Sequence, residues 1–312
     1  MPGRAFLGID TSNYTTSAAL FEDGRIIQSK RLLPVKEGQI GLRQSDAVFH
    51  HVQQLPTMLD VLWKEPATLG GVGVSVRPRD QEGSYMPCFT VGYGAAKMIA
   101  GALSVPVYTF SHQAGHIMAA LYSSDQIALC KQKFLAFHVS GGTTEALLVT
   151  PDKEHVFHCE LVAASLDLKA GQAVDRVGHM LGLPFPAGPA LEKLALEWTG
   201  PVKVHPVLKG ADCCLSGLQN QCQMMVSQGR EPAYIARYCL MTIEQTLSAM
   251  TEALFVKLGE LPLVFAGGVM SNSLIRQHLQ QKFNASFAEP AFSSDNAAGL
   301  AVLAYLRQEG EV

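Results

Sequence analysis

Two histidines could together hold a metal ion. His112 and His116 stand four positions apart in a segment that is typical of a helix. Residues at this spacing share one helix face, with Cβ atoms about 5–6 Å apart, so both imidazoles could bind one ion. Histidine pairs that bind no metal show the same spacing, and that alternative stays open. The H-E-x-x-H pattern of metalloproteases is absent because no Glu follows His112.

An acidic residue near the end of the sequence could supply a third ligand. Asp295 follows two serines and precedes an Ala- and Gly-rich segment that is typical of a helix. Its carboxylate could simply cap that helix. A carboxylate at a helix start could equally bind a cation. The residues alone leave both interpretations open.

Two glycine pairs could approach an anion or a nucleotide. Gly141 and Gly142 lie in a turn between two apolar strands, where their amides can approach a phosphate without an intervening Cβ atom. Gly267 and Gly268 follow a buried strand and precede a helix, which is where ligands bind in α/β sheets. A tight hairpin turn and an ordinary loop are the respective alternatives.

A further carboxylate, Asp175, lies on a predicted helix that is rich in small residues. It could accept a hydrogen bond from a ribose hydroxyl or a substrate amine. An ion pair with Arg176 is not expected, because adjacent residues point apart on a helix. The cysteines at 213, 214 and 222 match no common ligand spacing and are expected to be buried thiols.

An internal repeat indicates how these residues are positioned. Residues 6–20 and 134–148 align without gaps and are identical at seven of fifteen positions. Each copy is typical of a strand, a small polar turn and a second strand. The repeat occurs only twice and its spacing is far too long for a solenoid. The pattern indicates duplication of one α/β domain.

Strands alternate with helices along the rest of the chain, which predicts an α/β fold whose mixed or parallel sheets are covered on both faces. We expect a first domain over 1–122 and a second over 123–295, with a helix over 296–312 packing back on the first. A turn is expected at 151–153. Predicted strands cover 69–76, 105–109 and 263–266, and predicted helices cover 92–103, 112–121, 232–258, 272–282 and 296–306.

Composition excludes several classes of protein. Of the 312 residues, 48% are hydrophobic and 16% charged, so the chain is not disordered. It shows no apolar run of membrane-spanning length and no secretory signal. The formal charge of −3 gives no indication of a nucleic-acid partner. The seven scattered cysteines favour reduced thiols and a cytoplasmic location.

The repeated strand–turn–strand units with glycine-rich turns resemble the actin/Hsp70/sugar-kinase superfold. Five strings narrow the resemblance to the TsaD/Gcp family, formerly described as O-sialoglycoprotein endopeptidases, and it covers essentially the whole chain. These strings are Gly8-Ile-Asp-Thr-Ser12, His112-x-x-x-His116, Val139-Ser-Gly-Gly142, Ala266-Gly-Gly-Val269 with Asn272, and Asp295-Asn296.

The resemblance implies two tandem actin-like (ribonuclease-H-like) domains with a central nucleotide and metal cleft. It also implies an acyltransferase that moves threonylcarbamoyl from its adenylate to the exocyclic amine of a tRNA adenosine next to the anticodon. The implied partners are an adenine nucleotide, tRNA, and either a smaller homologous non-catalytic subunit with an ATPase or a second copy of the chain. No membrane is implied.

The resemblance also carries over site residues. The implied metal ligands are His112, His116 and Asp295, for iron or zinc, and magnesium is a further candidate cofactor. Candidate catalytic residues are Asp10, Ser12 and Asn13. Residues expected to contact ATP, another adenine nucleotide or threonylcarbamoyl-adenylate are His138, Val139, Ser140, Gly141, Gly142, Asp175, Gly188, Glu192, Gly267, Gly268 and Asn272.

The chain departs from the family pattern around the transferred group. Tyr14, Thr15 and Gln172 stand where the family carries carboxylates, and a phenol or hydroxyl cannot act as an equivalent base at neutral pH. Three further departures are Thr143 for a histidine, Arg77-Pro-Arg79 for Gly-Pro-Gly and Gln219 for a lysine.

These departures indicate a divergent paralogue. Its alternatives are a carbamoyl-type transferase with a different or already modified acceptor, and a catalytically silent nucleotide-binding protein. A kinase that uses Asp10 with magnesium is a weaker hypothesis, because the His pair has no role in it. A peptidase is not supported, since no nucleophile–base arrangement is apparent.

Overall fold

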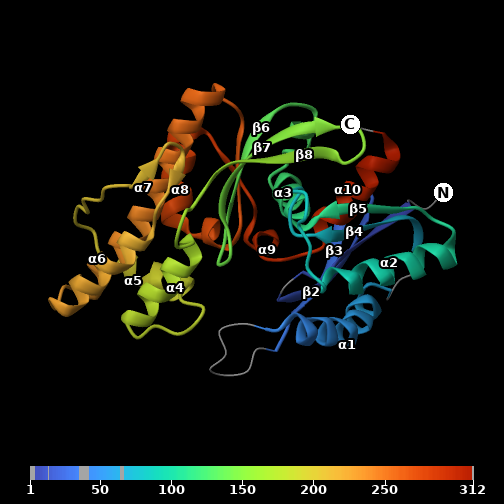
Figure 1. Cartoon of the computed structure of the whole chain (residues 1–312), viewed down its shortest axis with the longest axis horizontal. Coiled ribbons are helices and arrows are strands. Elements are labelled where there is room, and N and C mark those ends of the chain that lie inside the picture. The colour runs from blue at the N-terminus through green and yellow to red at the C-terminus, as the bar shows by residue number, and fades with distance from the viewer. Residues whose placement is uncertain (1–3, 13, 35–41, 64–66, 311–312) are drawn as a thin grey trace. The chain divides into compact units, whose positions relative to one another are not determined.

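The computed structural model describes residues 4–12, 14–34, 42–63 and 67–310 (Figure 1). The chain forms two compact units. The first unit comprises Met1–Gln132, Val149–Cys159 and Ser294–Val312, and the second comprises Lys133–Leu148 and Glu160–Ser293. The domain limits expected from the sequence stay a prediction.

The first unit is built on a five-stranded sheet in the order β3-β2-β1-β4-β5. Strand β2 is antiparallel to both β1 and β3, whereas β4 is parallel to both β1 and β5. The carboxyl ends of β1, β4 and β5 therefore share one edge. The strands are β1 (Arg4–Asp10), β2 (Thr15–Glu22), β3 (Arg25–Leu32), β4 (Thr68–Arg77) and β5 (Val107–Ser111).

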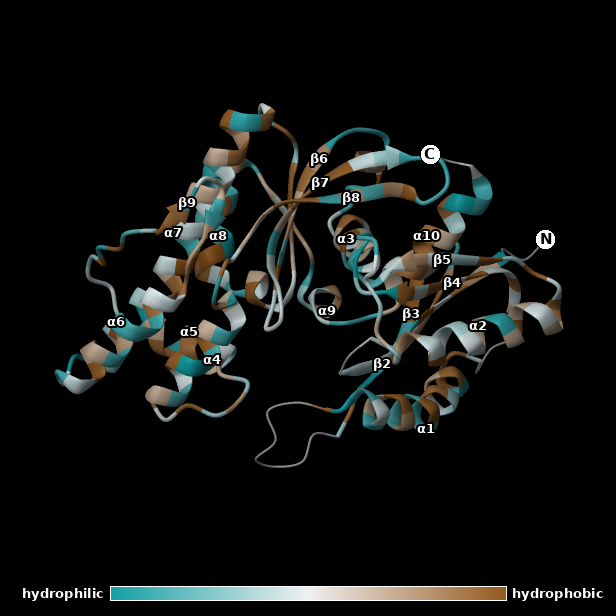
Figure 2. Ribbon diagram, viewed as in Figure 1, coloured by the Kyte–Doolittle hydropathy of each residue, from teal (hydrophilic) through white to brown (hydrophobic). Residues whose placement is uncertain are grey.

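Helices cover this sheet, with α1 packed on β2 and β3, α2 on β4, and α10 on β1, β4 and α3. The start of α10 is coloured hydrophobic and its end hydrophilic (Figure 2). The helical elements of this unit are α1 (Gln44–Leu62), α2 (Phe89–Leu103), α3 (His112–Ser123), the 3-10 helix η1 (Ile127–Lys131) and α10 (Ala298–Glu309).

Glycines let α10 approach its neighbours closely. A Cβ atom on Gly8 of β1 would lie 2.2 Å from the carbonyl oxygen of Ala297. A Cβ atom on Gly299 of α10 would lie 1.9 Å from the carbonyl oxygen of Gly115 of α3. Neither position has room for a side chain. This close packing fixes the segment before α10 against the first turns of α3.

A second five-stranded sheet, in the order β12-β11-β6-β7-β8, belongs mostly to the second unit, although Val149–Cys159 of β7, β8 and their turn are counted with the first. Strand β11 is parallel to both β6 and β12. Phe265 stacks between Phe137 and Phe287, with both ring centroids 5.0 Å away, and this ladder links the three parallel strands. The strands are β6 (Phe134–Val139), β7 (Thr144–Asp152), β8 (Val156–Ala164), β11 (Leu263–Ala266) and β12 (Ser286–Phe287), with a separate pair β9 (Leu208–Lys209) and β10 (Asp212–Cys213).

The long helix α7 organises the other helices of the second unit, since α4, α5, α6 and α8 all pack on it. The elements are α4 (Ala170–Met180), α5 (Gly188–Leu196), α6 (Ser216–Ser227), α7 (Pro232–Leu258), the 3-10 helix η2 (Gly268–Ser271), α8 (Ser273–Phe283) and α9 (Pro290–Ser293).

Most predicted elements are confirmed, including the helices that became α3 and α7 and the strand β11. The turn expected at 151–153 is wrong, because β7 continues to Asp152 and the turn covers 153–155. The capping role left open for Asp295 is also not seen. The N-cap of α10 is Ala297, and the amide of Ala298 donates to the side chain of Asn296 instead. Among the described residues, no helix is long and apolar enough to span a membrane.

Candidate metal centre and nucleotide-binding loops

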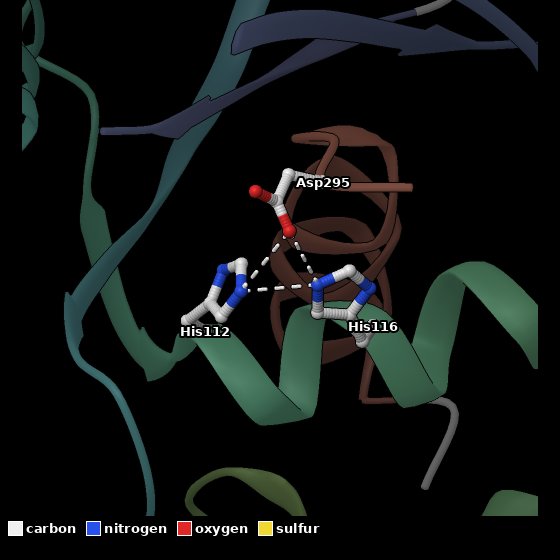
Figure 3. Close-up of side chains that lie close together, drawn as sticks. All are labelled: His112, His116 and Asp295. Carbon is white, nitrogen blue, oxygen red and sulfur yellow. Dashed lines mark hydrogen bonds and ion pairs between the residues drawn. The ribbon is translucent and has the colours of Figure 1, made fainter. Parts of the chain in front are cut away.

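Three side chains of the first unit point toward one another (Figure 3). His112 and His116 lie on the first two turns of α3, and Asp295 lies just before α10. Within the part of the chain that the structure describes, they form the one cluster of at least three His, Cys, Asp or Glu ligand atoms, all within 4.8 Å of one another. The spacing of the two histidines predicts their shared face, which the structure confirms.

The three donor atoms form a triangle of the size that a small divalent ion requires. The Nε2 atoms of His112 and His116 are 3.0 Å apart, and Oδ1 of Asp295 lies 3.6 Å from the former and 3.2 Å from the latter. Ligand atoms about 2.0–2.1 Å from a tetrahedral zinc ion are about 3.3 Å apart. Two imidazoles and one carboxylate also match the ligand preferences of zinc and of non-haem iron. The residues present therefore fit such an ion.

A buried carboxylate stands behind His112. Nδ1 of His112 lies 3.0 Å from Oδ2 of Asp10, a residue with no solvent exposure at the end of β1. An Nδ1–H that donates to this carboxylate leaves the Nε2 lone pair facing His116 and Asp295. Metal-binding histidines commonly have such a carboxylate partner.

Polar neighbours hold Asp10 in place. The hydroxyl of Ser12 donates to Oδ2 over 2.8 Å, and the hydroxyl of Ser75, from the neighbouring strand β4, donates to Oδ1. Burial acts to raise the pKa of Asp10, but the charge and hydrogen bond of His112 and the hydrogen bond of Ser75 outweigh it, so the pKa is lowered. Asp10 is thus a buried, ionised and fully hydrogen-bonded group.

Burial and neighbouring charges also act in opposite directions on the pKa values of His112 and Asp295. Burial lowers the pKa of His112, but the charges of Asp10 and Asp295 and the Asp10 hydrogen bond raise it to about 9. Burial acts to raise the pKa of Asp295, but His116 and His112, together with a hydrogen bond from Thr15, hold it well below its usual range. The cluster without metal is therefore anionic on the carboxylate side and protonated on His112.

The structure describes two of the three candidate catalytic residues and two of the residues that depart from the family pattern. Asp10 and Ser12 lie beside His112 but are buried and bonded to each other, so their catalytic role stays a prediction. Asn13 lies outside the described residues. Thr15, which replaces a family carboxylate, donates to Oδ2 of Asp295 over 3.1 Å. Gln172 accepts a hydrogen bond from the amide of Lys169 at the start of α4.

One important contact was missed at the sequence level. Ser75 is a completely buried hydroxyl that anchors Asp10. The one available signal is its type, because a serine interrupts the apolar stretch Leu69–Val76. A polar residue in a buried strand requires a partner, although the sequence does not say which.

In the second unit, two glycine-containing segments follow neighbouring parallel strands. His138 of β6 is in register with Ala266 of β11, so the turn after β6 and the loop after β11 lie at the same sheet edge. A Cβ atom on Gly267 would lie 2.3 Å from the carbonyl oxygen of Val139. This direct backbone contact brings the two predicted nucleotide segments together.

The turn after β6 remains open. The Ser140 amide donates to Thr143 over 2.7 Å, and the Gly171 amide of α4 donates to Ser140 over 3.1 Å. Gly141 and Gly142 are exposed, and a Cβ atom built on either meets nothing within 4 Å. The amides of this turn can therefore approach an anion.

The other predicted nucleotide residues lie within or directly before helices of the second unit. Asp175 accepts a hydrogen bond from the amide of Ala187, directly before Gly188, over 2.9 Å. Glu192 of α5 accepts hydrogen bonds from the amide and hydroxyl of Ser273. Asn272 caps α8 by accepting from the Ile275 amide. These side chains support the loops, and their nucleotide contacts stay predictions.

Solved structures with the same architecture identify the fold. HypF from T. kodakarensis matches with a TM-score of 0.65 at 12% identity, covering 99% of this chain and 48% of that one. Component A of (R)-2-hydroxyglutaryl-CoA dehydratase from Acidaminococcus fermentans matches with a TM-score of 0.58 at 15% identity, covering 98% and 99%. At these identities the similarity shows the fold alone, which is a tandem actin-like α/β fold.

Sequence similarity then identifies the family. The model of the TsaD family, tRNA N6-adenosine threonylcarbamoyltransferase, matches residues 33–302, and the chain belongs to this family. A relative of that description from Geobacillus kaustophilus is 31% identical over 329 residues, covering 98% of this chain and 92% of the relative. One from Methanopyrus kandleri is 27% identical over 289 residues, covering 90% and 80%. The expected family resemblance is thereby confirmed.

Proposed function

We propose that this chain is an active, metal-dependent threonylcarbamoyltransferase that uses threonylcarbamoyl-adenylate to modify a tRNA adenosine next to the anticodon. The observation that carries the proposal is the triangle of His112, His116 and Asp295, backed by Asp10, in a member of the TsaD family. The departure at Thr15 changes the surroundings of Asp295 and leaves the three donor atoms intact.

In this proposal the three ligands hold iron or zinc. A metal ion with three protein ligands keeps positions open for substrate oxygen atoms and polarises a carbonyl or phosphoryl group. The protein contributes the donor triangle and fixes its orientation through buried hydrogen bonds. Magnesium is the less suitable ion because it prefers oxygen ligands and keeps several waters.

The second unit would hold the adenylate in the segments around Gly141–Gly142 and Gly267–Gly268. Their location after parallel strands supports this role, because ligands of α/β sheets bind at the carboxyl ends of strands. The exposed glycine turn offers amides to the phosphate, and the start of α8 offers a helix N-terminus. Asp175 and Glu192 would maintain the helix starts that frame the site.

The test is transfer itself. The purified protein is incubated with threonylcarbamoyl-adenylate and unmodified tRNA, with and without partner subunits, and the digested nucleosides are analysed by mass spectrometry. We expect threonylcarbamoyl-adenosine from the wild type and none from His116→Ala. His155→Ala is the matched control, because His155 pairs with Asp152 at a hairpin turn and should retain full activity.

A complete absence of modified adenosine in every arm would contradict the proposed transfer. If such a protein still bound both metal and adenylate, the catalytically silent alternative would replace it. The two outcomes are separated by equilibrium binding of the adenylate, measured on the same sample.

One observation favours a different acceptor as the second candidate. Arg77, at the end of β4, is in register with Ser111, the residue before His112. Its Nη2 lies 3.4 Å from Asp80, and its buried Nε has no hydrogen-bond partner among the described residues. A guanidinium with an unused donor suits a carboxylate or phosphate. An acceptor nucleoside that carries a carboxylate would lose reactivity with Arg77→Gln, whereas the unmodified adenosine of tRNA, which has none, would not.

Partner binding and location are part of the proposal. Helix α1 exposes Phe49 and Val52, which are 58% and 56% accessible, and such an apolar face suits a smaller homologous subunit or a second copy of the chain. An ATPase partner follows from the family resemblance. All seven cysteines are free, which supports a cytoplasmic location, where tRNA is also found.

A further inference from the structure

We propose that Asp10 and Thr15 are positioning residues of the metal centre, each fixing one ligand without binding the metal itself. Asp10 orients His112, and Thr15 orients Asp295. This inference rests on the proposed metal centre, and it assigns roles to the two residues that surround the donor triangle. It also gives a reason for a threonine at position 15.

Asp10 is built into the sheet rather than exposed to a ligand. Both carboxylate oxygens accept hydrogen bonds, Oδ1 from Ser75 and Oδ2 from Ser12 and from His112. Ser75 lies in β4, which is paired in parallel with β1 up to Ile9, the residue before Asp10. Two rigid strands and one turn thus fix the carboxylate, and its solvent exposure is zero.

The location of Asp10 decides which nitrogen of His112 is available. Oδ2 of Asp10 faces Nδ1, so the stable neutral form of the ring carries its proton there. The lone pair of Nε2 then faces the donor atoms of His116 and Asp295, 3.0 and 3.6 Å away. Asp10 thereby selects the tautomer and holds the ring plane, and its charge makes the ring a stronger donor.

Thr15 has the corresponding role at Asp295. It begins β2, is 5% exposed, and its amide donates to the carbonyl of Ser12 over 3.1 Å, so its position is fixed by the turn. Its hydroxyl donates to Oδ2 of Asp295, while Oδ1 faces both histidines. The hydroxyl thus occupies one oxygen and leaves the other as the metal ligand.

The charge of the centre supports a neutral residue at position 15. Asp10, which is fully buried, and Asp295 already bring two carboxylates to the centre, whose charges balance one divalent ion. A carboxylate at position 15 would add a third negative charge beside Asp295. A hydroxyl holds the ligand and adds no charge.

The test is metal affinity rather than activity. Zinc affinity is measured by competition with a chromophoric chelator on metal-free protein, and the absorption spectrum of the cobalt(II) form reports the coordination geometry. We expect Asp10→Asn to weaken zinc binding about 10–100-fold, the range for loss of such a partner. Thr15→Val should weaken it about 3–10-fold and change the cobalt spectrum, and Thr15→Ser should restore both.

Three further variants separate a positioning role from a folding defect. Ser75→Ala removes one anchor of Asp10 and should weaken binding severalfold in a folded protein. Asp167→Asn and Thr246→Val change a carboxylate and a buried hydroxyl of the second unit and should leave zinc affinity unchanged. Circular dichroism of each metal-free variant checks that the fold is retained.

The outcomes distinguish this inference from the proposed centre. If neither the wild type nor His116→Ala binds zinc, the proposed metal centre is wrong. If the wild type binds zinc tightly but Asp10→Asn, Ser75→Ala and Thr15→Val bind it equally well with unchanged cobalt spectra, the centre stands and the positioning roles are refuted.

Discussion

The two units contain the same strand order but use the first turn of the sheet differently. Counted along each sheet, the third, second, first, fourth and fifth main strands are neighbours in both, as β3-β2-β1-β4-β5 and β8-β7-β6-β11-β12. Strand β1 ends in a buried carboxylate, Asp10, whose two oxygens accept hydrogen bonds from protein donors. The turn after β6 carries exposed glycines with free space around them. The same strand order thus positions a buried carboxylate in one unit and exposed backbone amides in the other.

The difference follows from the residues in the two turns. Asp10 is aligned with His138, and Ser12 with Ser140, in the internal repeat. In the first unit the side chains fold back on one another and on β4. In the second unit the backbone of Ser140 forms hydrogen bonds within the turn and with α4, and a Cβ atom built on Gly141 or Gly142 meets nothing within 4 Å. The end of β1 is therefore filled by its own side chains, whereas the turn after β6 leaves its glycines exposed.

The largest effect should follow from removing a ligand of the rigid site. His116→Ala deletes one of three donors, and we expect at least a 100-fold loss of zinc or iron affinity, because two remaining ligands hold such ions weakly. Metal content after gel filtration and chelator competition measure this loss. His179→Ala, a change in the last turn of α4, is the control. Equal metal content in the wild type, His116→Ala and His179→Ala would show that His116 is not a metal ligand. The first unit would then have no metal site to distinguish it from the second.

A pH-dependent change in stability is expected from a buried histidine of the first unit. His51 of α1 is fully buried, its Nδ1 lies 2.8 Å from the Thr16 hydroxyl, and burial lowers its pKa to about 4. Between about pH 6.5 and 4 the unfolded chain binds a proton here and the folded chain does not, so stability falls as pH falls through this window. The loss amounts to about 3 kcal/mol from a shift of this size.

The measurement uses the fluorescence of Trp63, which lies in the first unit, in a Trp198→Phe background. Unfolding in urea is compared at pH 7 and pH 4.5 with and without His51→Asn, which keeps a polar group near Thr16 and cannot titrate. We expect the pH-dependent difference between the two proteins to reach about 2–3 kcal/mol. Parallel behaviour of both proteins at the two pH values would show that His51 titrates normally.

A smaller loss should follow from filling the contact between α10 and α3. In Gly299→Ala the new Cβ atom would lie 1.9 Å from a backbone oxygen, so the helix must shift. We expect a loss of about 1–3 kcal/mol in the stability of the first unit, the usual cost of overfilling. The shift also moves Asp295, so zinc affinity should fall with it. Gly101→Ala in α2 meets nothing within 4 Å and should be neutral or slightly stabilising.

The sequence predicts those features of the site and the fold that depend on residues close together in the chain. The i, i+4 spacing places His112 and His116 on one face, and the repeat at 6–20 and 134–148 predicts the paired turns. Helix α1 is not predicted, because Pro56 interrupts its pattern. The third ligand, Asp295, follows from the family resemblance and not from spacing.

The contacts around the ligands could not be predicted from one sequence. Thr15 and Asp295 are 280 positions apart and meet because α10 packs on the first sheet through glycines. Ser75 reaches Asp10 through the register of two parallel strands. Long-range register and close helix packing are properties of the folded chain, so residue types alone predict that partners are needed without identifying them.

The smallest effect should come from the open turn of the second unit. A Cβ atom on Gly142 meets no protein atom within 4 Å, so Gly142→Ala should change stability by less than about 0.5 kcal/mol. If the turn receives a phosphate, the methyl group stands where the ligand must approach, and we expect affinity for threonylcarbamoyl-adenylate to fall about fivefold by calorimetry.

Gly171→Ala tests the same turn by displacing it. Its Cβ atom would lie 2.7 Å from the amide nitrogen of Gly141, so it should displace the turn and cost both stability and affinity. Gly217→Ala, which meets nothing within 4 Å at the start of α6, should cost neither. Unchanged adenylate affinity in Gly142→Ala, together with full affinity in Gly171→Ala, would mean that the glycines serve the hairpin alone. The two turns would then differ in burial without differing in function, and the nucleotide would have to bind elsewhere in the second unit.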